Sequence, residues 1–122
     1  MVNKVFLIAF TVFIIDRATK LIFFDSSSLN TGAAFSILQG YIWLFILIAV
    51  IVSLVIIFYR NETKYQLGMG ILLGGTLGNL IDRIFYGGVI DFIRIYTIPL
   101  FNLADVSNII GALMIIYIMY KN

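Results

Sequence analysis

The sequence predicts an all-α integral membrane protein with four transmembrane helices in a single domain, residues 1–122. The chain is 62% hydrophobic, and its mean hydropathy is +1.10. Only 11% of its residues are charged, against about 25% in soluble domains. Four apolar segments, each close to the ~20 residues that a spanning helix needs, make up most of the chain.

The first two predicted spans differ in the charges that they carry. The first covers residues from about 4–24 and holds Asp16, Arg17 and Lys20 in its second half. These charges interrupt the apolar run, and no small-residue cleavage site follows them, so we expect a retained helix and not a signal peptide that is removed. The second span, about 41–59, has no charged residue and is the strongest candidate to cross a bilayer.

Small residues recur along the third predicted span, about 65–85. Three glycines spaced four residues apart form a ridge along one side of this helix: Gly70, Gly74 and Gly78. Such a ridge lets another helix approach closely, so we expect it to be a packing surface. The stretch lacks the Gly-Lys-Ser/Thr ending of a phosphate-binding loop. The fourth span covers residues from about 104–120.

The two sides of the predicted membrane domain differ in chemistry. The longer connections, residues 25–40 and 86–103, fall on one side, and the short turn at 60–64 falls on the other with both termini. The polar residues of the spans crowd toward the first side: Asp16, Lys20, Asn79, Asp82, Arg83 and Asp105. The Lys and Arg counts of the two sides tie, but the cations on the polar side lie near aspartates in sequence. We therefore expect both termini and the short turn in the cytoplasm.

The composition excludes several kinds of chemistry. The chain has no cysteine and no histidine, so disulfides, thiolate nucleophiles and the usual zinc ligands are excluded. Acid–base chemistry must therefore come from Asp, Glu, Lys or Tyr. The net charge of +2 is small and dispersed, which predicts no nucleic-acid partner. We expect no metal and no cofactor.

Asp91 and Asp105 are the leading candidates for chemistry. An ionisable group at membrane depth costs roughly 2.5–3.5 kcal/mol and is a functional candidate by default. Two carboxylates brought together can share one proton and activate a water. Thirteen residues separate the two, including Pro99, so they meet only if the connection folds back. The alternative is that Asp105 caps its helix while Asp91 pairs with Arg94.

The protonation of these two aspartates is predicted only as a property of the pair. A helix N-terminus stabilises an ionised Asp105. Desolvation by apolar neighbours makes Asp91 the better candidate for the protonated partner. The two titrations are coupled, so the assignment belongs to both residues together.

Three other motifs each have a structural and a functional interpretation. Asp16 and Lys20 are i, i+4 neighbours, which suits an interfacial ion pair with the lysine snorkelling outward, or a pair that supports the site or meets a lipid headgroup. Residues 30–36 are rich in turn formers and form either a loop or a substrate-facing segment. Arg83 is permanently charged, so it forms a salt bridge with Asp82 or Asp16, or supports a catalytic carboxylate.

Taken in order, these motifs resemble the lipoprotein signal peptidase family, also called signal peptidase II, over nearly the whole chain. The matching pieces are Asp16-x-x-Thr19-Lys20, Asn30-x-Gly32-x-Ala34-Phe35, Gly74-Gly75-x-x-Gly78-Asn79-x-x-Asp82-Arg83, Val89-x-Asp91-Phe92 and Phe101-Asn102-x-Ala104-Asp105. Each piece is weak alone, but their order on a plan of four spans is specific. The resemblance implies a membrane aspartic endopeptidase that cleaves signal peptides from bacterial prolipoproteins, just before the diacylglyceryl-modified cysteine.

The resemblance also implies roles for single residues. Asp91 and Asp105 stand at the two catalytic positions. A second set binds substrate or supports the site: Asp16, Lys20, Asn30, Gly32, Asn79, Arg83, Asn102 and Ala104. The family has a small extracytoplasmic β-cradle and a short covering segment, which residues 25–40 and 86–103 would build here. The connection between the two aspartates is short for the family, so we expect a reduced covering segment.

The setting that the resemblance implies is the bacterial cytoplasmic (inner) membrane. The protein would be multi-pass, with the active site near the outer face and both termini cytoplasmic. Its partners would be diacylglyceryl-prolipoprotein substrates and membrane lipids, and we expect a monomer. The residues alone also suit a small four-span transporter whose carboxylate carries protons. A carrier needs that acid near the midplane, whereas these acids cluster at one face, so the peptidase is favoured.

Overall fold

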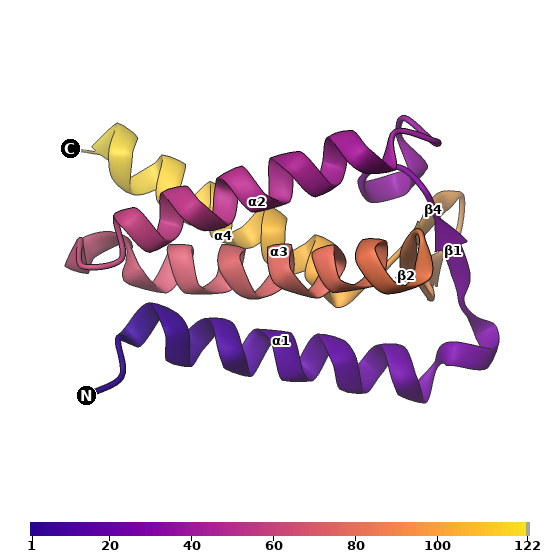
Figure 1. Cartoon of the computed structure of the whole chain (residues 1–122), viewed down its shortest axis with the longest axis horizontal. Helices are drawn as coiled ribbons and strands as arrows, with labels where there is room; N and C mark the ends of the chain where they lie inside the picture. The colour runs from indigo at the N-terminus through magenta and orange to yellow at the C-terminus, as the bar shows by residue number, and fades with distance from the viewer. Residues whose placement is uncertain (122) are drawn as a thin grey trace.

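The computed structural model describes residues 1–121 and shows four long helices with short strands at one end (Figure 1). The helices are α1 (Lys4–Ile22), α2 (Ile42–Phe58), α3 (Gln66–Tyr86) and α4 (Leu103–Lys121). Each of them matches a predicted span to within two residues at either end. The mostly helical fold is therefore confirmed.

Membrane crossing by all four helices stays a prediction. Among the helices of residues 1–121, only α4 is both long and apolar enough to meet a length-and-composition criterion for a span. The apolar helix α2 has 17 residues, which is shorter than the criterion requires, and α1 and α3 carry the charges of the polar end. At 1.5 Å per residue the four helices are roughly 26–32 Å long, close to the ~30 Å of a hydrocarbon core.

Helix α3 is the central helix of the bundle, because it packs against α1, α2 and α4. Its glycine ridge faces α1. A Cβ on Gly70 would lie 2.6 Å from the Cβ of Ile8, and one on Gly74 would lie 2.6 Å from the Cβ of Val12. Neither position has room for a larger side chain. The predicted packing role of the ridge is therefore confirmed, and it brings the charged half of α1 against α3.

The ends of the helices are fixed by local hydrogen bonds. The Asn3 side chain caps α1 by accepting from the Val5 N–H at 2.9 Å. It also donates to the Asn61 side chain at 2.9 Å, which joins the start of the chain to the α2–α3 turn. Helix α3 stops at Gly87, whose φ of +72° is a left-handed conformation that glycine adopts without strain. Both termini and the α2–α3 turn lie at one end of the bundle (Figure 1).

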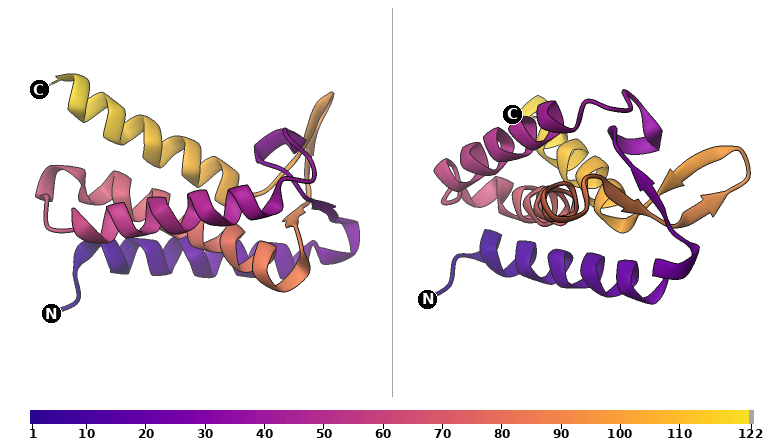
Figure 2. Two further views of the ribbon diagram at one scale, coloured as in Figure 1. Left: turned by 45° about the horizontal axis from the view of Figure 1, so that its top comes forward. Right: turned by 45° about the vertical axis from the view of Figure 1, so that its right-hand side comes forward.

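The strands lie at the opposite end and form two small antiparallel sheets. Strand β1 (Ser28–Asn30) pairs with β2 (Val89–Asp91), and β3 (Ile93–Ile95) forms a hairpin with β4 (Ile98–Phe101). The hairpin projects from the end of the bundle (Figure 2). The small β-structure that the resemblance implied is therefore present, and it is built from the two predicted connections.

The loop over residues 31–40 lies beside β4. It contains the short 3-10 turn η2 (Ala34–Ser36), and three of its residues adopt positive φ values: Phe35, Ser36 and Leu38. The Phe35 ring lies 5.7 Å from the ring of Phe101, so the loop is packed onto the hairpin. Positive φ is unfavourable outside glycine, so this packing holds a strained backbone. The loop is the candidate for the predicted covering segment.

Candidate active site

The chain folds back so that Asp91 and Asp105 bind the same asparagine. Asp91 ends strand β2, and Asp105 lies in the first turn of α4. The Asn102 side chain donates to Asp91 Oδ1 at 2.8 Å, and the Asn102 backbone N–H donates to Asp105 Oδ2 at 3.1 Å. The β3–β4 hairpin makes the reversal that the sequence required. The two carboxylates therefore belong to one buried network.

The second oxygen of each carboxylate is also held by an amide. Asn30 Nδ2 donates to Asp91 Oδ2 at 3.0 Å, and Asn79 Nδ2 donates to Asp105 Oδ1 at 3.0 Å. The Asp105 N–H donates back to Asn102 Oδ1 at 2.9 Å, which completes a reciprocal cap at the start of α4. Asn102 is thus the N-cap of α4, and Asp105 is the residue three positions on that completes the capping box.

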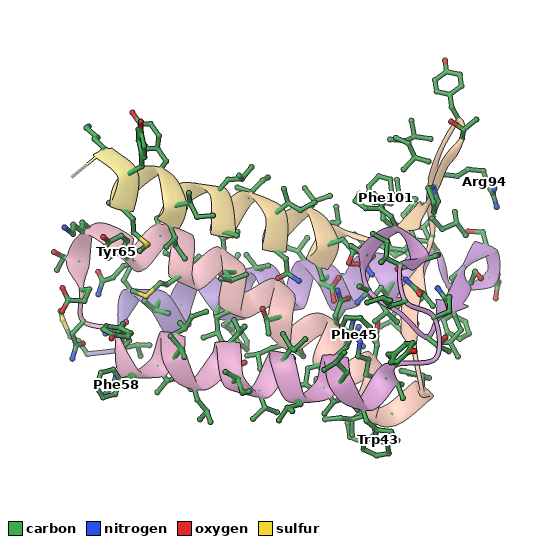
Figure 3. All side chains as sticks on the ribbon, turned by 90° about the horizontal axis from the view of Figure 1, so that it is seen from above. Trp43, Phe45, Phe58, Tyr65, Arg94 and Phe101 are labelled. Atoms are coloured by element: carbon green, nitrogen blue, oxygen red, sulfur yellow. The ribbon has the colours of Figure 1, made fainter. Side chains whose placement is uncertain are left out.

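The other half of the alternative interpretation, an Asp91–Arg94 pair, is wrong. No such ion pair occurs within residues 1–121. Arg94 is exposed on strand β3 and points away from the bundle (Figure 3).

Asp91 has a strongly raised pKa. Burial raises it most, because the side chain is almost completely enclosed and a charged carboxylate is poorly solvated there. The nearby charge of Asp105 raises it further. The amide hydrogen bonds from Asn30 and Asn102 and the charge of Lys20 oppose the shift, and the resulting pKa is about 7. Asp91 therefore holds a proton up to neutral pH.

Asp16 and Lys20 form the predicted ion pair, but the lysine does not snorkel outward. The distance from Lys20 Nζ to Asp16 Oδ2 is 2.8 Å. Lys20 is 1% exposed, and its ammonium group also contacts Asp82 at 2.8 Å and Asn79 at 3.0 Å. Three buried oxygen acceptors replace water around the ammonium group, so its burial is compensated without contact with the membrane interface.

Arg83 does not form the predicted salt bridge with Asp82 or Asp16, because both of those aspartates pair with cations of α1. Instead, Arg83 Nη2 donates to the carbonyl oxygen of Gly32 at 3.1 Å. Its guanidinium group lies 5.3 Å from the centre of the Phe45 ring, a cation–π distance. Arg83 thus supports the loop beside the site.

The remaining predicted site residues complete the same network. The Ala104 N–H donates to Asp16 Oδ1 at 3.2 Å. Asn30 Oδ1 accepts from the Gly32 N–H at 2.8 Å, and an added Cβ on Gly32 would collide with the Ile37 carbonyl group. Hydrogen bonds or ion pairs therefore connect all ten residues that were assigned to the site.

Three residues of the network were not assigned to the site from the sequence. Arg17 and Asp82 form an ion pair between α1 and α3, and the Gln39 side chain donates to Asn30 Oδ1 at 2.6 Å. The opposite charges of Arg17 and Asp82 at one membrane face were a usable signal. Gln39 gave none, because a polar loop residue is the ordinary case.

A groove leads from the site along the bundle. Its volume is about 470 Å³, and it is bounded by α2 and α4 with α3 between them. Its polar end is formed by Asn79, Arg83 and Asp105, and apolar side chains line the rest. A second cavity of about 710 Å³ continues it toward the α2–α3 turn and shares Val52 and Leu72 with it.

Asp91 is reached from a different side. A cavity of about 400 Å³ lies between the β-structure and the covering loop, and its lining includes Asn30, Gln39 and Asp91. In the part of the chain that the structure describes, no group of three or more ligand residues is arranged to hold a metal ion. The chemistry available from these residues is acid–base chemistry by two carboxylates.

Comparisons with known proteins agree with the sequence resemblance. A family model described as signal peptidase (SPase) II matches residues 8–121. The lipoprotein signal peptidase of Anoxybacillus flavithermus is 37% identical in an alignment of 139 positions, which covers 92% of this chain and 83% of that protein. The lipoprotein signal peptidase of Pseudomonas putida is 38% identical over 142 residues, covering 91% of this chain and 83% of that protein.

Solved structures share the fold over its whole length. A structure described as a bacterial membrane enzyme at 2.3 Å resolution has a TM-score of 0.87 and 32% sequence identity, and the match covers 99% of this chain and 90% of that one. A second, described as a bacterial membrane enzyme at 1.9 Å, has a TM-score of 0.84 and 31% identity, covering 100% and 96%.

Proposed function

Because the chain belongs to the signal peptidase II family, we propose that it is an aspartic endopeptidase that removes signal peptides from bacterial prolipoproteins. Cleavage occurs just before the diacylglyceryl-modified cysteine. The observation that carries this proposal is the buried network in which Asn102 binds both Asp91 and Asp105. Two coupled carboxylates are the machinery of an aspartic protease.

In this mechanism the two carboxyl groups share one proton. Ionised Asp105 takes a proton from a water, and the water oxygen attacks the scissile carbonyl carbon. Protonated Asp91 donates a hydrogen bond to the carbonyl oxygen, which stabilises the negative charge that develops there. The raised pKa of Asp91 suits it to hold that proton near neutral pH. Proton transfer to the leaving nitrogen then completes peptide cleavage, and no acyl-enzyme forms.

The charge balance of the network supports a single shared proton. Four buried carboxylates lie at this end of the bundle: Asp16, Asp82, Asp91 and Asp105. Three cations accompany them: Arg17, Lys20 and Arg83. With every group charged, one negative charge would remain unbalanced, which is costly away from water. One proton on the Asp91–Asp105 pair makes the network neutral.

The groove between α2 and α4 is the proposed place for the apolar part of the signal peptide. Its cavities are lined by α4 from Asp105 to Met119, a rise of roughly 21 Å for a helix. The apolar core of a signal peptide has about 7–15 residues, which this length accommodates as a helix. The scissile bond would then lie at the polar end, while the diacylglyceryl chains stay in lipid.

We place the protein in the bacterial inner membrane as a monomer with four crossings and with membrane lipids around it. Both termini and the α2–α3 turn are cytoplasmic in this arrangement, and the catalytic end is near the outer face. Tyr41 and Trp43, which are both exposed, then lie at the outer interface, where aromatic side chains are enriched. Figure 3 places Trp43 on the outside of the catalytic end.

Cleavage of a defined substrate tests the proposed function. Purified protein in detergent or lipid is incubated with a prolipoprotein, with and without the diacylglyceryl modification, and the products are examined by gel shift and mass spectrometry. We expect cleavage of the modified substrate only, with the modified cysteine as the new first residue. A folded protein that leaves both substrates intact contradicts the proposal.

A further inference from the structure

Two aspartates outside the catalytic pair hold the backbone next to it. Asp82 Oδ2 accepts from the N–H of Ile90, the residue before Asp91, at 3.1 Å. Asp16 Oδ1 accepts from the N–H of Ala104, the residue before Asp105, at 3.2 Å. Each catalytic aspartate thus has a buried carboxylate fixed to the peptide that precedes it.

The same two aspartates are joined to each other by two cations. Lys20 Nζ lies 2.8 Å from Asp16 and 2.8 Å from Asp82, and Arg17 Nη2 contacts both carboxylates as well. We call this group the charge clamp: Asp16, Arg17, Lys20 and Asp82. Both aspartates and the lysine are buried.

Close packing of α1 against α3 leaves the charge clamp little freedom. A Cβ on Gly78 would collide with the Asp16 carboxylate group, so only glycine fits there. The clamp also reaches the catalytic network directly, because Lys20 donates to Asn79 Oδ1 at 3.0 Å. Asn79 in turn donates to Asp105. Any shift of the clamp therefore changes the position of both catalytic peptides.

We propose that the charge clamp sets the position of Asp91 against Asp105 and the pH range in which they share a proton. This inference rests on the proposed function, in which these two aspartates are catalytic. Arg17 and Asp82 are positioning residues in it, since they act through Ile90 and Lys20 and line no part of the groove beside Asp105. A buried ion cluster contributes little to stability compared with apolar packing, which favours a positioning role over a purely structural one.

Removing a negative charge near Asp91 and removing a positive one should shift the pKa of Asp91 in opposite directions. Asp105 of α4 and Lys20 of α1 act directly on the Asp91 carboxyl group, and Arg83 of α3 interacts with it as well. Asp16 and Asp82 pair with both Lys20 and Arg17, so these three residues act on Asp91 through Lys20. Strand β1 and helix α2 contain no charged residue, and Arg94 of β3 is exposed. Removing a clamp carboxylate leaves excess positive charge and lowers the pKa of Asp91, whereas removing a clamp cation raises it.

The test compares Asp82→Asn with Arg17→Gln, which remove opposite charges from one ion pair. For both variants we expect kcat to fall at least about tenfold with KM unchanged, because the interaction positions reacting groups. The alkaline limb of the pH–rate profile should move to lower pH by roughly 0.5 pH unit or more in Asp82→Asn, and to higher pH by a similar amount in Arg17→Gln. Arg17→Lys should restore the wild-type limb.

The matched control is Arg60→Gln, which removes a cation at the far end of the bundle, where the Arg60 side chain donates to the Ile57 carbonyl group. It should leave kcat and the pH profile unchanged. Arg17 is partly exposed, so Arg17→Gln remains measurable even if Asp82→Asn does not fold. Two outcomes overturn the proposed role of the charge clamp. One is an unchanged kcat in Arg17→Gln. The other is that the alkaline limbs of the pH–rate profiles of Asp82→Asn and Arg17→Gln do not shift in opposite directions.

A second readout separates this inference from the proposed function. The protonated carboxyl band of Asp91 is followed against pH by infrared spectroscopy without substrate, and Asp91→Asn identifies the band. A protein that cleaves no prolipoprotein but whose Asp91 titration moves in opposite directions in the two variants refutes the peptidase and retains the clamp. If the titration of Asp91 shifts in neither variant, the proposed role of the charge clamp is refuted, whatever the cleavage activity.

Discussion

At the scale of single residues, Asn102 is the buried amide that links the two candidate catalytic aspartates. It is fully buried and contacts both catalytic candidates, Asp91 through its side chain and Asp105 through its backbone and side chain. Its Nδ2 group also lies within hydrogen-bond distance of Asn79 Oδ1, at 3.2 Å. One neutral amide therefore keeps two acidic groups close together without adding charge, which a proton-sharing pair needs.

Replacing Asn102 with alanine should lower kcat by roughly 10²-fold, because both carboxyl groups lose a partner that orients them. The effect is measured as initial cleavage rates with a diacylglyceryl-modified prolipoprotein. Asn61→Ala is the control, since Asn61 lies in the α2–α3 turn, far from the site, and its side chain accepts from Asn3. Equal rates in the two variants would contradict the role given to Asn102.

Activity should decline as pH rises through about 7. The pKa of Asp91 is raised to about 7, so the carboxyl group is protonated below this pH and loses its proton above it. The mechanism needs that proton, and kcat/KM should therefore fall close to tenfold per pH unit on the alkaline side. The measurement is a pH–rate profile from pH 5 to 9, and a flat profile across that range would contradict a shared proton.

Single residues also show where sequence reasoning stops. The i, i+4 spacing predicted the Asp16–Lys20 pair correctly. It did not predict that Lys20 would be buried, because that depends on acceptors from α3 that are 59 and more residues away in sequence. Arg83 was expected to bind a carboxylate and binds a loop carbonyl group instead. Asp16 and Asp82 already pair with Arg17 and Lys20.

At the scale of elements, glycines on α3 decide how closely the charged helix α1 can approach. The ridge was visible in the sequence as a regular spacing, and so were the helices, because each is a long apolar run. The pairing of β1 with β2 was not readable from the residues. Each strand has only three residues, and the partners Leu29 and Ile90 are 61 positions apart, so no local pattern identifies them.

Enlarging the ridge should destabilise the bundle. A Cβ on Gly74 would lie 2.6 Å from Val12 Cβ and 2.7 Å from the Ala9 carbonyl oxygen, so Gly74→Ala forces α1 away from α3. We expect a loss of about 1–3 kcal/mol in the free energy of unfolding, seen as a lower thermal midpoint in detergent. Leu113→Ala, at an exposed position of α4, should change the thermal midpoint little. A drop as large as that of Gly74→Ala would contradict the packing role of the ridge.

At the scale of the whole molecule, the strands lie at one end and both termini at the other (Figure 1). The buried charged residues belong to the end that carries the strands. The sequence predicted this separation from the order of its polar residues. It also gave the four-helix plan and, through the family resemblance, the place of the β-structure. The groove between α2 and α4 could not be predicted, because it depends on how the helices diverge in space (Figure 2).

Membrane orientation can be measured with single cysteines, because the chain has none of its own. Tyr96→Cys places a thiol on the exposed β3–β4 turn, and Asn61→Cys places one in the α2–α3 turn. In bacterial cells with a permeabilised outer membrane, an impermeant maleimide should label Tyr96→Cys alone. Asn61→Cys should react only after the inner membrane is opened. Labelling of both in intact spheroplasts would contradict the four-span arrangement.

The most direct test of the proposed catalytic pair is the cleavage assay applied to Asp91→Asn and Asp105→Asn beside the wild type. Each variant keeps the size of the side chain and removes its acid–base function, and thermal midpoints confirm that the proteins are folded. We predict that the wild type cleaves the diacylglyceryl-modified prolipoprotein and that each variant loses at least about 10³-fold in rate. Cleavage by either folded variant at a rate near that of the wild type would contradict an aspartic mechanism at this site.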